Sequence, residues 1–138
     1  MPVLASNPSL VLHLHPGPLP TLETEWLAFV NSTDFRRYVE EALVLAKQHG
    51  VKAWVANDQR LGAVRPVDLR WVSEYVLPAI AELGVLRFAR LESGETLNRL
   101  LIGNMYQGAT QVQPFEVRTF TNLPQARAWA SGADTDVA

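Results

Sequence analysis

Apolar and polar positions along the chain follow two periods, one typical of strands and one typical of helices. Residues 9–15 and 22–30 place apolar side chains at alternate positions, and a turn with three prolines at 16–20 separates them. Because proline cannot continue a hydrogen-bonded ladder, this pattern predicts two strands joined as an antiparallel hairpin.

A helix and a buried strand are predicted next. Apolar residues recur at helical spacing over residues 35–46, after the polar stretch 31–34, which supplies N-cap oxygens and an acid for the first turn. Gly50 suits the position just past the end of this helix. The run 51–57 is apolar at both parities apart from Lys52, which favours a central strand covered on both faces.

The middle of the chain completes a strand–helix–strand unit and indicates the α/β class. Residues 66–83 carry an apolar stripe at helical spacing, and residues 85–91 form the next apolar run. Pro66 suits the start of the helix, whereas Pro78 lies inside it and is expected to kink or split it.

The C-terminal third predicts a helix, an edge strand and a short final helix. Apolar spacing over 97–105 favours a helix that Gly103 and Gly108 interrupt. Residues 115–121 alternate as a half-exposed strand, and residues 123–130 form a short helix capped by Asn122.

Domain organisation follows from these elements. We expect one domain over residues 9–130, a flexible N-terminus at 1–8 and a disordered tail at 131–138. The predicted sheet is mixed and five-stranded. Right-handed crossovers between successive parallel strands would place the helices mainly on one face. The other face would then be uncovered and apolar, which makes it a candidate homodimer surface.

Composition excludes several classes of function. The 138 residues contain no cysteine, so disulfides, thiolate metal sites and cysteine nucleophiles are ruled out. A net charge of −2 argues against a general nucleic-acid binder. No apolar run is long enough for membrane insertion and no signal peptide is recognised, so a cytoplasmic protein is expected.

Several segments together carry a family resemblance: residues 53–58, 66–72, 77–78, 87–90, 120 and 126–129. Over roughly residues 9–130 the chain resembles the small SpoIIAA-like proteins of the STAS/SEC14-related superfamily. The resemblance implies a SpoIIAA-like (STAS-like) βα superhelix. It also implies a non-enzymatic regulatory or protein-interaction module that forms a homodimer and binds an unidentified protein partner.

The usual phosphorylation switch of that superfamily is not expected in this chain. Related anti-sigma factor antagonists carry a phosphorylatable Ser or Thr after the strand that matches residues 51–57. Here no Ser or Thr lies between Asn57 and Val72, and the first hydroxyl is that of Ser73, well inside the predicted helix. A phosphate needs an accessible hydroxyl to act as a switch.

The loop after the buried strand is the candidate ligand or partner surface, because α/β folds bind ligands at the carboxyl ends of their strands. The candidate residues, in this loop and on the following helix, are Asn57, Asp58, Arg60, Arg65, Trp71 and Tyr75. The alternative function is that of a small-molecule-binding protein, for an apolar or polar ligand, or a weak hydrolase that uses the loop 57–65. A purely structural reading also remains open, in which Asp58 caps the turn or pairs with Arg60 or Arg65.

Other polar residues are expected to be structural, and no metal, cofactor or catalytic residue is predicted. His13 and His15 have a spacing that can bind a metal, but a third ligand such as His49 or a carboxylate is not adjacent in sequence, so a solvent-facing strand end is favoured. Arg87 and Arg90 have opposite parity in one strand. A buried arginine there needs a carboxylate, for which Glu116 is a candidate.

Overall fold

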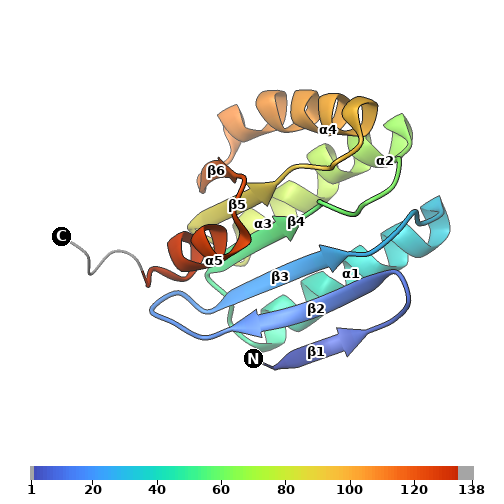
Figure 1. The fold of residues 1–138 in the computed structure, drawn as a ribbon. Helices are drawn as coiled ribbons and strands as arrows, with labels where there is room; N and C mark the ends of the chain where they lie inside the picture. Colours follow the sequence, from blue (N-terminus) through green and yellow to red (C-terminus); the bar gives the residue numbers. More distant parts are fainter. Residues whose placement is uncertain (1, 134–138) are drawn as a thin grey trace.

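A mixed six-stranded sheet forms the centre of the molecule in a computed structural model that describes residues 2–133 (Figure 1). Its strands lie side by side in chain order, antiparallel from β1 to β3 and parallel from β3 to β6. They are β1 Val3–Ser6, β2 Leu10–His15, β3 Thr21–Trp26, β4 Ala53–Asn57, β5 Arg87–Leu91 and β6 Glu116–Phe120. The predicted hairpin, central strand and edge strand are therefore confirmed as β2–β3, β4 and β6.

The first strand corrects two expectations, because the sheet has six strands rather than five and residues 3–6 form β1 instead of a flexible lead-in. This segment is short and alternates weakly, so its own pattern does not predict a strand. It forms because the free edge of β2 offers hydrogen-bonding partners, including the Leu14 amide, which donates to the Pro2 carbonyl at 3.0 Å.

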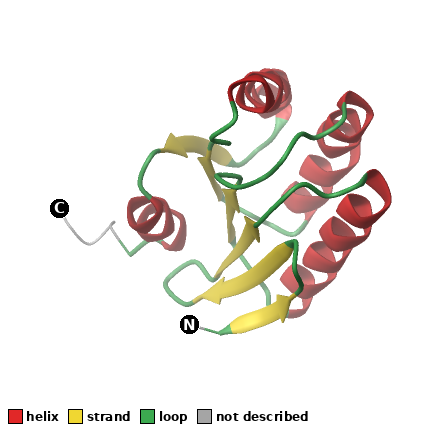
Figure 2. Cartoon of the chain, turned by 45° about the vertical axis from the view of Figure 1, so that its right-hand side comes forward, coloured by secondary structure: helices red, strands yellow, loops and turns green. Residues whose placement is uncertain are grey.

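Helices cover both faces of the sheet (Figure 2). The elements are α1 Ser32–Gln48, α2 Pro66–Trp71, η1 Val72–Val76, α3 Leu77–Glu82, α4 Thr96–Ala109, η2 Thr110–Val112 and α5 Leu123–Ser131. Helices α1 to α4 pack on one face around the larger core, and α5 lies on the other. Ser131, expected to begin a disordered tail, ends α5; residues 134–138 of that tail lie outside the described part of the chain.

Pro78 splits its helix, as the sequence predicts. The chain widens into the π-helical turn η1, in which the Leu77 amide donates to the Val72 carbonyl, and α3 then begins with Pro78 in its first turn. A proline there interrupts no hydrogen bond that α3 needs. Gly103, in contrast, does not interrupt α4.

The expectation of an uncovered apolar sheet face is wrong. Helix α5 packs Ala126 and Trp129 against the β4 and β5 side of that face, near Val55 and Ala89. Among residues 2–133 no strand follows α5, so the crossover rule does not determine on which face α5 lies. Small residues on both elements let it approach the sheet closely. The β2 and β3 side of the same face is polar, as described below.

Side-chain caps start two helices as predicted. Asn31 accepts a hydrogen bond from the Asp34 amide at 2.8 Å, and Asn122 accepts one from the Gln125 amide at 2.9 Å. None of the described helices combines the length and the apolar character needed to cross a lipid bilayer.

Candidate functional site

The end of β4 places two consecutive polar side chains on opposite faces of the sheet. Asn57 contacts Glu23 on the α5 face, whereas Asp58 lines a cavity on the α1–α4 face. Both residues are buried. The predicted loop site is therefore two sites, which we call the polar network and the internal cavity.

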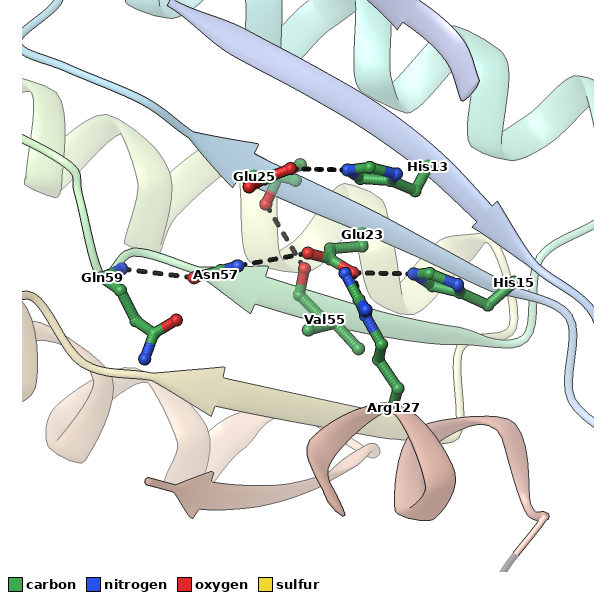
Figure 3. A network of polar contacts seen from close by, with 9 residues as sticks. His13, His15, Glu23, Glu25, Val55, Asn57, Gln59 and Arg127 are labelled. Atoms are coloured by element: carbon green, nitrogen blue, oxygen red, sulfur yellow. Dashed lines mark hydrogen bonds and ion pairs between the residues drawn. The ribbon is translucent and has the colours of Figure 1, made fainter. Parts of the chain in front are cut away.

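The polar network is centred on the buried carboxylate of Glu23 in β3 (Figure 3). One carboxylate oxygen, Oε1, accepts from His15 Nε2 at 2.7 Å and from Arg127 Nε at 2.7 Å. The other, Oε2, accepts from Asn57 Nδ2 at 3.2 Å. The strands β2 and β4 and the helix α5 thus each donate to one carboxylate of β3.

Glu23 is ionised at neutral pH despite its burial. Removal from water raises the pKa of Glu23, but the hydrogen bonds from His15, Arg127 and Asn57 and the charge of Arg127 outweigh it and lower the pKa to about 2. The carboxylate is therefore a fixed negative charge inside the fold.

A second histidine–glutamate pair extends the network toward solvent. His13 Nε2 lies 2.7 Å from Glu25 Oε1, and the rings of His13 and His15 stack with centroids 5.8 Å apart. The expectation that these histidines form a solvent-facing strand end is wrong, because β3 places Glu23 and Glu25 beside them and His15 is buried.

The internal cavity lies between the sheet and the helices α1 to α4 and has a volume of about 70 Å³. Thr24, Asp58 and Tyr106 are its polar lining residues in the described part of the chain. The others are Trp26, Phe35, Val39, Trp54, Ala56, Leu61, Val64, Leu69, Val72, Val76, Leu77, Ile80, Phe88, Ile102 and Met105. A cavity with these walls favours an apolar occupant.

Asp58 is a buried carboxyl without a hydrogen-bond donor among residues 2–133. Burial raises the pKa of Asp58 to about 7, against the opposing charge of Arg90. Arg90 lies over the ring of Tyr106 at 4.2 Å from its centroid, and its Nε has no partner among the described residues. Burial and then the negative charge of Asp58 raise the pKa of Tyr106, so this phenol stays protonated.

Glu116 is not the partner of the buried arginine. Arg90 faces the α1–α4 side, where Asp58 is the nearby acid, whereas Glu116 pairs with Arg118 at 3.5 Å on the exposed edge strand. Arg87, of opposite parity, donates to the Trp129 carbonyl at 2.6 Å on the α5 side.

The other predicted site residues do not join Asn57 or Asp58. Arg60 and Arg65 are exposed on the loop. Trp71 is half-buried against Phe35 and stacks on the exposed Tyr75 at 5.6 Å, and Tyr75 donates to Glu40 at 3.5 Å. Neither aromatic ring lines the cavity, so these two predicted residues are not part of that site.

Sequence reasoning missed the two glutamates and Arg127. The signal is a Glu-x-Glu pattern on β3 with the same period as the His-x-His pattern on β2. In the hairpin His13 lies directly opposite Glu23, so a correct register places all four side chains on one face.

The fold is SpoIIAA-like, in agreement with the fold that the resemblance in the sequence implies. A similar solved structure is that of an uncharacterized DUF3478-family protein with a SpoIIAA-like fold from Shewanella loihica PV-4. The two chains are 13% identical, with a TM-score of 0.59 over 92% of this chain and 98% of that one. No protein-family model and no curated protein matches the sequence. At this identity the likeness establishes the fold, and function must be argued from the two sites.

Replacing Glu23 tests the polar network. We expect Glu23→Gln to lower the free energy of unfolding by about 3 kcal/mol at pH 7, because the pKa is lowered from 4.5 to about 2 and each unit corresponds to about 1.4 kcal/mol. This stabilisation is complete above pH 4.5 and is lost as the pH falls toward 2. The difference in the free energy of unfolding between wild type and Glu23→Gln, measured in urea titrations, should therefore narrow over that range. The exposed control Glu116→Gln should change stability by less than about 0.5 kcal/mol. Equal stability of Glu23→Gln and wild type at pH 7 contradicts this account.

Replacing Asp58 is expected to change the free energy of unfolding in the opposite direction. The folded state raises the pKa of Asp58 from 3.8 to about 7, so it holds a proton that the unfolded chain releases in this range. Stability is therefore lost progressively as the pH rises from about 4 to 7, up to about 4 kcal/mol. We expect Asp58→Asn to be more stable than wild type at pH 8 and similar to it at pH 4, measured by urea unfolding. If the free energies of unfolding of Asp58→Asn and wild type differ by the same amount at pH 4 and pH 8, the pKa of Asp58 is not raised by folding.

Proposed function

We propose that this protein is a non-catalytic binding module that holds a small, largely apolar molecule in the internal cavity, with a hydrogen-bond donor of that molecule directed at Asp58. The observation that carries the proposal is a buried carboxyl, without a donor among residues 2–133, at the wall of an apolar cavity.

The energetics of the cavity support this proposal. A water molecule needs roughly 10–15 Å³ of such space, so a cavity of about 70 Å³ accommodates something larger. Burial of an apolar ligand against its apolar walls is favourable, and a buried polar group without a partner carries a free-energy penalty. A ligand hydroxyl or amine that donates to Asp58 would relieve that penalty.

The polar lining favours binding over hydrolysis. A hydrolase needs an activated nucleophile or base together with donors that stabilise the developing charge. Here the Thr24 hydroxyl donates to the Val55 carbonyl at 3.5 Å, and the raised pKa of Tyr106 keeps its hydroxyl protonated. Asp58 is left as the single acid of the described lining, suited to orienting a donor.

Three ligands of similar shape test the proposal: toluene, benzyl alcohol and benzylamine. We expect all three to raise the melting temperature of the wild-type protein, the latter two more than toluene because they donate to Asp58. In Asp58→Asn, toluene should still raise the melting temperature, but benzylamine should raise it no more than toluene does.

A cavity-filling variant provides the control for these measurements. Ala56→Leu extends a wall residue into the cavity and should abolish all three shifts. If none of the compounds shifts the melting temperature of the wild-type protein, or if Ala56→Leu leaves the shifts unchanged, the proposed cavity site is wrong.

The second candidate function is a regulatory protein-interaction module that forms a homodimer, and the outer face of α4 favours it. Leu97, Leu100 and Leu101 lie on one side of this helix and are 59%, 58% and 36% exposed. Its inner side carries Ile102 and Tyr106, which line the internal cavity. Clustered exposed leucines are typical of association surfaces.

Light scattering after size-exclusion chromatography tests this association. We expect a dimer for the wild-type protein and a monomer for Leu100→Glu, because a buried charge opposes the contact. Val44→Glu introduces the same charge at a 55% exposed site on α1 and should leave the dimer intact. A monomeric wild type at high concentration removes the homodimer from the proposal.

A further inference from the structure

The solvent-facing end of the polar network brings together one imidazole and two carboxylates. Ligand atoms of His13, Glu23 and Glu25 all lie within 4.8 Å of one another. His13 and Glu23 are opposite each other in the β2–β3 ladder, and Glu25 is two residues further along the same face. Two paired strands therefore hold the three side chains on a rigid frame. We infer that His13, Glu23 and Glu25 form a binding site for a divalent transition-metal cation.

Access and remaining coordination capacity support this site. The side chains of His13 and Glu25 are 16% and 28% exposed, so a cation can enter from solvent. Glu23 is buried and forms the inner wall of the site. Its Oε2 accepts one hydrogen bond, from Asn57, and retains a second lone pair while His15 and Arg127 stay on Oε1.

Charge balance also favours a cation. Two carboxylates meet at the site, and one of them, that of Glu23, pairs with Arg127. A divalent cation would bind His13 Nε2 and Glu25 Oε1, which lie 2.7 Å apart. One imidazole nitrogen and two carboxylate oxygens suit Zn²⁺ better than Mg²⁺, which prefers oxygen ligands and retains its water. Three protein ligands leave a position for water, as in open zinc sites.

Calorimetric titration with Zn²⁺ alone tests the site on tag-free full-length protein treated with a chelator. We expect one Zn²⁺ per chain and a higher melting temperature with Zn²⁺. His13→Ala and Glu25→Gln should each weaken binding at least about tenfold. His49→Ala is the matched control, since His49 is an exposed histidine at the end of α1, and it should bind as wild type does.

Folding and binding are separated by two readouts. Both site variants alter partly exposed side chains, and their melting temperatures without Zn²⁺ report whether they fold. Stoichiometric binding that either folded variant weakens supports the site. An absence of binding by the wild type, or binding that both variants leave unchanged, overturns it.

Discussion

A single buried carboxylate links parts of the chain that are far apart in sequence. Glu23 accepts hydrogen bonds from β2, β4 and α5, and Arg127 is 104 residues away from it. An ionised group at this depth is tolerated only because its oxygens are so fully bonded. The position of α5 on the sheet therefore depends on the bond from Arg127 to Glu23 as well as on the apolar packing of Ala126 and Trp129.

The alternation of side chains along β4 separates the two sites chemically. Asn57 faces a charged, partly hydrated network, and Asp58 faces an apolar space whose polar lining is sparse. A buried carboxyl group consequently behaves differently on the two faces. One buried carboxylate has a pKa near 2 because donors surround it, and the other has a pKa near 7 because donors are missing.

Local signals in the sequence predict the elements well, since each depends on nearby residues. The split at Pro78, the caps at Asn31 and Asn122, and the continuous apolar strand before Asn57 are of this kind. The proximity of Asp58 to the charge of Arg90 depends on which faces two separate strands present to each other. The side taken by α5 depends on packing after the last strand, and β1 depends on an edge that another strand provides. No local pattern in the sequence determines these three features.

The candidate site was predictable in part for the same reason. The end of β4 follows from the general rule for α/β folds, and both Asn57 and Asp58 lie there as expected. The contact of Asn57 with Glu23 depends on the register between β3 and β4, which no local pattern in the sequence determines. Arg60, Arg65, Trp71 and Tyr75 are close to the loop in sequence, but none of the four lines the internal cavity, and Arg60, Arg65 and Tyr75 are exposed.

The histidine–glutamate ladder also bears on how the hairpin selects its alignment during folding. A slip of one residue between β2 and β3 would turn one strand over, so that its polar side chains would face the apolar core and its leucines would face outward. Breaking the His15–Glu23 and His13–Glu25 pairs in this way would leave ionised groups in an apolar environment. The ladder thus penalises misaligned hairpins more strongly than a purely apolar hairpin would.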